Sequence, residues 1–505
     1  MPFFFPAPSL AATLAGHQRD GNRVDLKLDD GEASVEFWSD STFRFTRHWG
    51  KPPAARDASP SAVAFELSET PIHLRLASRH LVIEIEKSGL RVRASEVDGT
   101  VLMADAGVVE RKGRSLAWER TAARGARFYG LGARAGPLDF RGTRVEALKP
   151  FLISSVGYGE YHVAPGRYTF DARPADRYRI EAEGADMLDY YCFYGPAPKD
   201  IFEQVLPIAG PIDKMSPSKF RALARGEVPG AATFPEQPGD SLEDFIRRLV
   251  NGSMSAILMP GFVPKASSPR AMQLGAVMPV LVGPERPGIR ARLTAYWMTY
   301  AEEARDRGFP FLRPMPMQYP RDPEAGRYGD QFSLGDEILV APIFGEGRRR
   351  TVYLPMGIWT NLATGEVFNG RQAIPVESDE LPLFSRNGAI LPLGQDPMEL
   401  HYFPKLGGEF FLYEADLADY SQVHASPAGD VFRLEIESKK DREFEWIVHH
   451  LERPRKVTVK DQPLKAAGEP GALPSNAWRY VAAEKSLHVR VAAEKGDHHI
   501  ATVWF

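Results

Sequence analysis

The chain has 505 residues, 43% hydrophobic and 25% charged, which is typical of a folded protein with about three domains and excludes a disordered or fibrous one. Its formal net charge is -4, so no overall positive field attracts nucleic acid or an acidic membrane. Cys192 is the only cysteine, which excludes an intrachain disulfide and a cysteine-based zinc site. Because Cys192 lies in the aromatic run Tyr190–Tyr194, we expect a buried structural thiol.

The N-terminal stretch Met1–Pro6 is apolar but has no basic n-region, no apolar segment of secretory length and no clear cleavage site. No window of the sequence reaches the length of apolar residues that a transmembrane helix needs. We therefore predict a cytoplasmic protein.

From about residue 20 to residue 195, polar and apolar residues alternate over short segments, as in Val24–Leu28 and Leu81–Glu86. Such alternation is typical of antiparallel strands with one buried face. Turns rich in glycine separate these segments, and no long helical pattern occurs among them. This part therefore predicts a large β-sandwich.

Helical patterns occur between about residues 198 and 310. The first predicted helix is 198–205. The second places four apolar residues at helical spacing (Leu242, Phe245, Ile246 and Leu249), and the third has an apolar stripe over 289–304 and ends at Gly308. The short apolar run Ser255–Met259 between the last two helices predicts a strand, so the region indicates a parallel α/β unit.

After about residue 320 the alternating pattern returns and continues to the end of the chain. The predicted strands are 337–340, 351–354, 389–391, 431–436 and 456–459. We divide the chain into an N-terminal β-sandwich (1–205), an α/β part (206–320), a proximal C-terminal β domain (321–400) and a distal one (401–505).

Several motifs resemble segments of glycoside hydrolase family 31, the α-glucosidase and α-xylosidase group, in the order that family has them. They are Phe128–Asp139 (family FYGLGEKAGPLD), Phe151–Gly159 (PFFISSRGYG), Tyr194–Pro198 (YGPTP), Gly308–Pro314 (GxPxxRPL) and Gly335–Pro342 (GDxLLVAPV), followed by Tyr353–Trp359 and Phe384–Ile390. The resemblance implies a mainly β fold with an α/β part: a galactose mutarotase-like N-terminal sandwich, a (β/α)₈ barrel region and two C-terminal β-sandwich domains.

The barrel region is too short for the family. A (β/α)₈ barrel typically needs about 250 residues, but only about 110 lie between the Tyr194–Pro198 segment and Arg313. Ala222–Gly230 resembles the family's VLTRSGFAG, and Gly239–Ser241 resembles the GDN that carries the acid/base aspartate. The resemblance therefore implies a barrel remnant of roughly its last two units.

The resemblance carries one catalytic residue over, Asp240 as the candidate acid/base. The nucleophile is unknown, because nothing in the sequence is similar to the family's WxDMNE segment. Asp240 also precedes the second predicted helix, with Glu243 three residues later, so a capping box is the alternative interpretation. Arg225 matches an arginine that contacts the sugar in the family; an ion-paired surface arginine is the alternative.

Retaining hydrolysis needs a second carboxyl group about 5 to 5.5 Å from the first. By charge alone, the candidates are Asp139, Glu160, Asp244 and Glu285. Other family positions that face the sugar have changed: Ala133 replaces a glutamate, Ala271 replaces a tryptophan, and the loop at 145–148 is shortened.

Neither a metal nor a cofactor is predicted. The pairs His449-His450 and His498-His499 lie in strand-like segments, where neighbouring side chains point to opposite faces and cannot bind one ion together. The sequence has no phosphate-binding glycine-rich loop, nucleophile elbow or zincin signature.

These observations predict a degenerate, non-hydrolytic relative of family 31 that binds a carbohydrate or a partner protein, without nucleic acid or membrane. One alternative is an active retaining α-glycosidase with a rebuilt site. A second is a subunit whose barrel is completed by another chain, or a homo-oligomer that covers the remnant, since parallel strands need both faces covered and their edges paired.

Overall fold

The computed structural model describes residues 12–50, 61–209, 241–254, 292–344, 347–468 and 471–505, with residues 232–235 and 262–265 described as backbone only. The chain divides into two compact units. The first comprises residues 1–210 and 251–257, and the second comprises residues 211–250 and 258–505. The division into four domains stays a prediction.

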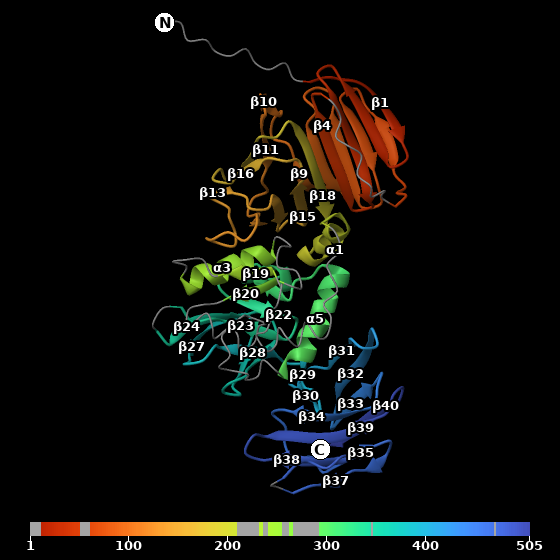
Figure 1. Ribbon diagram of the computed structural model, residues 1–505, viewed down its shortest axis with the longest axis vertical. Helices are drawn as coiled ribbons and strands as arrows, with labels where there is room; N and C mark the ends of the chain where they lie inside the picture. The colour runs from red at the N-terminus through yellow and green to blue at the C-terminus, as the bar shows by residue number, and fades with distance from the viewer. Residues whose placement is uncertain are drawn as a thin grey trace. The chain divides into compact units, whose positions relative to one another are not determined.

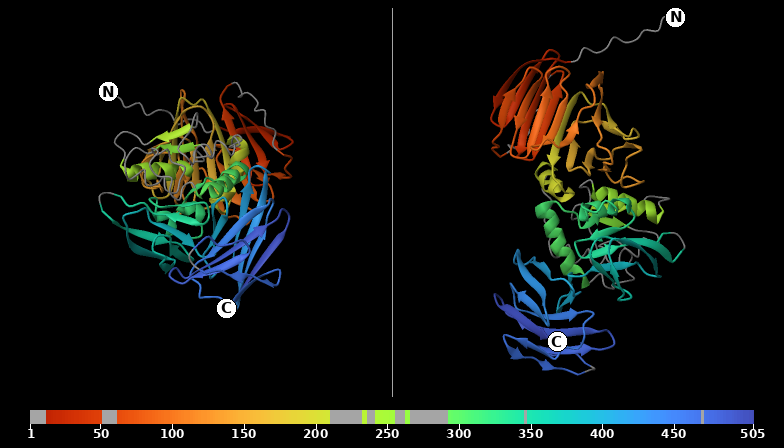
Figure 2. Two further views of the ribbon diagram at one scale, coloured as in Figure 1. Left: turned by 60° about the horizontal axis from the view of Figure 1, so that its bottom comes forward. Right: turned by 180° about the vertical axis from the view of Figure 1, so that it is seen from behind.

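The first unit is a large β-sandwich made of three antiparallel sheets (Figure 1). Its eight-stranded sheet has the order β1 (Leu14–Asp20), β2 (Arg23–Leu28), β3 (Glu32–Ser39), β4 (Thr42–His48), β18 (Met187–Tyr194), β15 (Tyr158–His162), β14 (Phe151–Ser154) and β12 (Phe128–Gly130). β1 to β4, whose residues fall in the red part of the colour bar in Figure 2, are consecutive neighbours in this sheet.

Two five-stranded sheets complete this unit. One contains β5 (Glu66–Glu69), β6 (His73–Ala77), β7 (Leu81–Glu86), β8 (Val92–Glu96) and β9 (Val101–Ala104) in chain order. The other has the order β10 (Glu110–Lys112), β11 (Ser115–Thr121), β17 (Arg177–Glu183), β16 (Arg167–Asp171) and β13 (Arg144–Glu146).

One hydrophobic core joins all three sheets, because each sheet turns its apolar face inward. In β2 the alternation seen in the sequence buries Val24, Leu26 and Leu28 and exposes the residues between them. These residues belong to the same core cluster as Leu76 of β6 and Trp118 of β11. The predicted N-terminal β-sandwich is therefore confirmed.

The helices agree with the predicted periodicity. The predicted 198–205 helix is α1 (Pro198–Ala209), which continues one turn further, through Pro207. The second is α3 (Leu242–Ser253), and the third is α5 (Thr294–Arg307). Gly308 ends α5 in the left-handed conformation, with its N–H donating to the carbonyl of Ala304.

The α/β part of the second unit contains one parallel pair of strands in the described part of the chain. β19 (Ala232–Pro235) pairs with β20 (Phe262–Lys265), and α3 lies between them in sequence. The predicted strand 255–259 lies outside the described residues. The pattern predicted neither β19 nor β20, since each has only four residues, too few to show a period, and contains a proline.

The remainder of the second unit is β structure. A six-stranded sheet has the order β21 (Leu312–Pro314), β22 (Phe332–Leu334), β23 (Ile338–Val340), β28 (Leu383–Arg386), β25 (Ile358–Asn361) and β26 (Val367–Asn369), and β24 (Arg349–Leu354) pairs with β27 (Gln372–Glu377). The short helices α6 (Met315–Gln318) and η2 (Ala325–Arg327) follow β21. Leu339, Leu354 and Trp359 share one core, so both sheets belong to one domain core.

Two further six-stranded sheets follow. The first has the order β29 (Ile390–Gly394), β30 (Met398–Tyr402), β34 (Arg442–Val448), β39 (Ser486–Ala493), β38 (Ala477–Val481) and β37 (Lys465–Ala466). The second has the order β31 (Gly408–Glu414), β32 (Asp419–Ala428), β33 (Val431–Glu437), β40 (His498–Trp504), β35 (Lys456–Val459) and β36 (Gln462–Pro463). α5 contacts both β29 and β31. The predicted mainly β fold, with few helices and C-terminal β domains, is confirmed.

Candidate functional site

The candidate site follows from the parallel pair β19 and β20. Their register joins Ala232 to Phe262 and Pro235 to Lys265, so their carboxyl ends lie at the same edge. In (β/α) barrels the reacting groups lie at the carboxyl ends of the strands. In sequence, Asp240 lies in the connection from the carboxyl end of β19 to α3, the position that a catalytic carboxylate of a barrel occupies. Both predicted site residues, Asp240 and Arg225, lie outside the described residues.

The start of α3 shows which residue caps that helix. The Ser241 hydroxyl accepts the backbone N–H of Asp244 at 3.1 Å and donates to Oδ2 of the same residue at 2.7 Å. Since α3 begins at Leu242, Ser241 is the N-cap and Asp244 the third helical residue. Glu243 instead forms an ion pair with Arg247, one turn along. The cap of α3 is therefore the Ser241 hydroxyl, one residue after the Asp240 position that the sequence suggested.

The candidates for a second carboxylate have structural partners. Oδ1 of Asp139 accepts the backbone N–H groups of Phe128 at 3.0 Å and of Arg141 at 3.1 Å, which fixes a turn. The Asp244 carboxylate accepts the hydroxyl of Ser241, the N-cap of α3. Glu285 lies outside the described part of the chain.

Glu160 lies within the core of the sandwich, in a network of buried charges. Its Oε1 is 2.8 Å from Nη2 of Arg120, whose Nη1 pairs with Asp105, and its Oε2 accepts the Tyr178 hydroxyl at 3.2 Å. Burial alone would raise the pKa of the Glu160 carboxyl, but Arg120 and His162 beside it hold that pKa at about 2. Glu160 is thus an ionised structural group that no substrate reaches.

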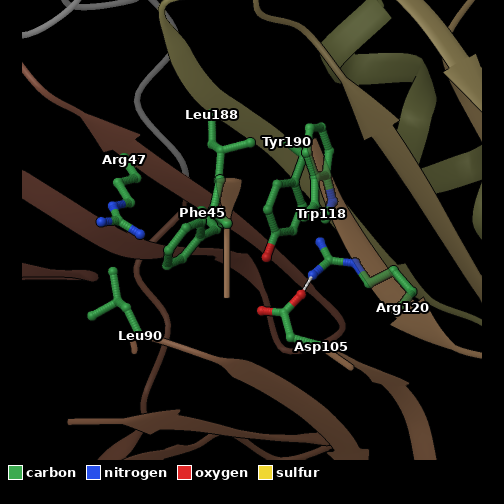
Figure 3. Close-up of a pocket in the computed structure, with 9 residues that line it drawn as sticks. Phe45, Arg47, Leu90, Asp105, Trp118, Arg120, Leu188 and Tyr190 are labelled. Carbon is green, nitrogen blue, oxygen red and sulfur yellow. Dashed lines mark hydrogen bonds and ion pairs between the residues drawn. The ribbon is translucent and has the colours of Figure 1, made fainter. Parts of the chain in front are cut away.

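A small cavity lies beside this network, as Figure 3 shows. Its walls include Phe45, Trp118 and Tyr190, and the Arg120 guanidinium points at Asp105 along one side. The cavity measures about 10 Å³, room for about one water molecule. Ligand pockets usually measure about 300 to 1,000 Å³, so this cavity does not fit a sugar.

The motif Phe128–Asp139 has a structural role in this fold. The buried Arg134 guanidinium donates to the carbonyls of Gly130 at 3.3 Å and Leu138 at 3.1 Å, which closes the loop on itself. Nδ2 of Asn251, in the last turn of α3, donates to the carbonyl of Arg134 at 3.0 Å. No sequence signal pointed to Asn251, because its partner is a backbone atom far away in the chain.

The motifs Gly308–Pro314 and Gly335–Pro342 meet at one ion network. The Arg313 side chain is fully buried and pairs with Asp336 through Nη1 and with Glu303 of α5 through Nη2. Nε2 of Gln318 donates to Oδ1 of Asp336 at 2.6 Å. The arginine and the aspartate of these motifs thus fasten α5 to the following sheet.

The histidine pairs take part in local contacts. Nε2 of His449 lies 3.0 Å from Nδ1 of His401, whose Nε2 lies 2.9 Å from Glu399. Burial, reinforced by the neighbouring histidines, lowers the pKa of His449 to about 3. On β40, His498 is exposed and His499 is buried, as alternation requires. Within the described ranges, no group of three or more His, Cys, Asp or Glu side chains is arranged to hold a metal ion.

Cys192 is buried, and burial raises the pKa of its thiol, so the expected structural thiol is confirmed. Among the helices that the structure describes, none has both the length and the apolar character needed to cross a membrane.

Two family models match the chain. Residues 32–149 match the glycosyl hydrolase 31 N-terminal galactose mutarotase-like domain, and residues 308–391 match the glycosyl hydrolase family 31 C-terminal domain. The first match lies in the large β-sandwich, and the second covers the sheet that begins at β21.

Curated relatives are similar over part of their length. The chain is 28% identical to Alpha-glucosidase 2 of Bacillus thermoamyloliquefaciens over 214 residues, which cover 35% of this chain and 27% of that protein. It is 34% identical to an alpha-glucosidase of Saccharolobus solfataricus over 110 residues, which cover 22% of this chain and 16% of that protein. The chain thus spans about a quarter or less of these relatives.

Solved structures share the fold at low identity. A family 31 dextranase of Flavobacterium johnsoniae, complexed with isomaltotriose, superposes with a TM-score of 0.80 at 15% identity and covers 98% of this chain and 100% of that chain. A family 31 alpha-xylosidase of Xanthomonas citri superposes with a TM-score of 0.65 at 12% identity and covers 83% and 95%.

Proposed function

Because this chain belongs to glycoside hydrolase family 31, we propose that it binds an α-linked glucose- or xylose-containing carbohydrate without hydrolysing it. The relatives named above support this choice of sugar, since they are alpha-glucosidases, a dextranase and an alpha-xylosidase. The absence of hydrolysis rests on the carboxyl groups.

The observation that carries the proposal is that each candidate second carboxylate in the described part of the chain already has a structural partner. A retaining glycosidase needs a nucleophile and an acid/base about 5 to 5.5 Å apart. Asp139, Glu160 and Asp244 are each held in a turn, an ion network or a helix cap. Asp240 is therefore left without any of these three as its catalytic partner, in a region about 140 residues shorter than a typical barrel.

A hydrolysis assay tests the catalytic part of the proposal. Aryl α-glucosides and α-xylosides are incubated with the full chain at several pH values, and we expect no turnover above buffer. The Asp240→Asn variant is the decisive comparison, with Glu243→Gln as the control in the first turn of the same helix. Turnover that Asp240→Asn abolishes and Glu243→Gln retains would establish the alternative, an active α-glycosidase with a rebuilt site.

Calorimetric titration tests the binding part. We expect isomaltotriose, maltose or an α-xyloside to bind with saturation and to raise the unfolding temperature. If none of them binds, the prediction of a carbohydrate ligand is wrong, and binding of a partner protein is the remaining interpretation. Arg225→Met is expected to weaken saturable binding, because the matching arginine of the family contacts the sugar.

A second candidate is a subunit completed by another chain. In the part of the chain that the structure describes, β19 and β20 pair only with each other, and parallel strands are usually covered on both faces. Native mass spectrometry of the protein from its source cells is the test. A mass of one chain argues against it, and a larger mass identifies a homo-oligomer or a partner.

We also propose a cytoplasmic location. A buried sole cysteine is compatible with a reducing compartment, where disulfides are rare. Fractionation of the source cells tests this location, and recovery outside the cytoplasmic fraction would contradict it.

A further inference from the structure

Two tyrosines of α5 converge on one buried carboxyl group. Tyr296 and Tyr300 are one helical turn apart, so their side chains lie on the same face of α5. Their hydroxyl oxygens lie 2.9 Å and 2.5 Å from Oε2 of Glu337, in the connection between β22 and β23. Glu337 is buried, and both tyrosine rings are buried with it.

The hydrogen atoms of this cluster can be counted. The Tyr296 hydroxyl has one hydrogen but two oxygen neighbours, the carbonyl of Leu334 at 2.6 Å and Oε2 of Glu337 at 2.9 Å. The Tyr300 hydroxyl donates to Glu337 and accepts the backbone N–H of Asp336 at 3.0 Å. An ionised carboxylate has no hydrogen to donate. If Glu337 were ionised, the single hydrogen of Tyr296 could serve only one of its two oxygen neighbours, and the other contact would lack a hydrogen.

A protonated Glu337 satisfies every one of these contacts. The carboxylic acid donates to the Tyr296 oxygen, Tyr296 donates to Leu334, and Tyr300 donates to Glu337. Because an unsatisfied buried polar group costs about 1 to 3 kcal/mol, the fully bonded arrangement is favoured.

The charged groups around Glu337 are of both signs. Asp336 precedes it and disfavours a second negative charge, whereas Arg386 from β28 favours one. Arg313 already pairs with Asp336 and Glu303. Burial, with Asp336, raises the pKa of Glu337 to about 7, even though the donating Tyr300 hydroxyl and Arg386 oppose that rise.

We propose that Glu337 is a proton-binding site, a carboxylic acid that keeps its hydrogen up to neutral pH and whose hydrogen holds α5 to the β22–β23 connection. Loss of the proton leaves a buried negative charge beside Asp336 and removes the hydrogen shared with Tyr296. The contact between α5 and this connection then weakens. A rise of pH through neutrality thus loosens the packing of α5 against the β22–β23 connection in the second unit.

Thermal unfolding against pH is the first test. The stability that Glu337 contributes is complete below about pH 4.5 and is lost as pH rises through about 7, so wild type is expected to lose several degrees of Tm in the transition of the second unit over this range. Glu337→Gln, which resembles the protonated acid, is expected to lose much less. Glu380→Gln is the control, since Glu380 is exposed. A Glu337→Gln profile parallel to that of wild type would overturn the proposal.

Tyr300→Phe gives a readout that a purely structural role would not give. The Tyr300 hydroxyl donates to the carboxylate and therefore favours its ionised form. Without this hydroxyl, the pH at which the Tm decline ends is expected to move upward. An upper end of the decline that stays in place, or moves to lower pH, contradicts the assignment.

Infrared spectroscopy tests protonation directly and does not depend on a variant that folds. In wild type with glutamate carboxyl groups labelled with ¹³C, we expect the C=O band of one protonated glutamate at about pH 6, and its loss by about pH 9. Because only glutamate carries the label, this band is distinguished from any band of the buried Asp105 carboxyl group. The absence of a labelled acid band at about pH 6 would overturn the proposal.

Discussion

Ser241 and Asp244 hold the first turn of α3 through two reciprocal contacts: the Ser241 hydroxyl donates to the Asp244 carboxylate at 2.7 Å and accepts the Asp244 backbone N–H at 3.1 Å. An N-cap satisfies a backbone donor that the helix itself leaves without a partner. The helix cap therefore depends on Ser241, which separates it from the candidate acid/base Asp240.

Substitution of the cap is expected to destabilise α3. Ser241→Ala removes both contacts, and we expect a loss of about 1 kcal/mol in the free energy of unfolding of the second unit. Denaturant titration measures this loss. Asp240→Asn is the matched comparison and is expected to change stability by less than about 0.5 kcal/mol. A larger loss for Asp240→Asn than for Ser241→Ala would return the capping role to Asp240.

Gly335 tolerates no side chain. Its φ is +57°, and a Cβ there would lie 2.2 Å from Cε2 of Tyr300 and 2.6 Å from the Tyr296 hydroxyl. We expect Gly335→Ala to cost about 2 to 5 kcal/mol, the sum of backbone strain and overpacking. Gly429 is the control: its φ is +63° but no atom lies within 4 Å of an added Cβ, so Gly429→Ala costs about 1 kcal/mol. Equal losses in the two variants would refute the close contact.

Arg120 neutralises two buried carboxylates at once. Arg120→Met leaves Asp105 and Glu160 without their cation, and we expect a loss of about 3 to 5 kcal/mol in the stability of the first unit. Arg144→Met is the control, because its pair with Glu181 is half exposed and is worth less than about 1 kcal/mol. Calorimetry of both variants measures the difference. A small loss of stability in Arg120→Met would mean that Asp105 and Glu160 do not depend on the charge of Arg120.

The first unit is expected to lose stability in acid because of Glu160. Its pKa is about 2 in the fold and about 4.5 in an unfolded chain, so its stabilising effect is complete above about pH 4.5 and is lost as pH falls through about 2. Over that window the loss is about 3 kcal/mol. Glu160→Gln should flatten this part of the stability profile, whereas Glu66→Gln, at an exposed position, should leave it unchanged. An unchanged slope in Glu160→Gln would contradict the ion network.

Much of the fold could be predicted from the sequence because local patterns determine it. Alternation in Val24–Leu28 gives a strand with one buried face in any sandwich, and helical spacing from Leu242 to Leu249 gives α3. Gly308 ends α5 as expected, since a left-handed residue there favours glycine. β19 escaped prediction because its four residues carry too little pattern.

The candidate site was only partly predictable, because position in a motif does not say what a side chain contacts. Glu160 was a candidate carboxylate by charge, yet it lies in the sandwich core against Arg120, 40 positions earlier in the chain. Asp244 was another, and it belongs to the cap of its own helix. Asn251 and Glu337 gave no signal, since their partners come from other elements.

The sequence by itself determined the family, the order of β and α parts and the shortness of the barrel region, because motifs, periodicity and length are properties of the chain alone. Only the tertiary structure decided which charges are buried together and which carboxyl groups are already bonded. Those outcomes depend on desolvation and on contacts between distant residues, such as Arg313 with Asp336 and Tyr296 with Glu337, which form only when the sheets and α5 have packed.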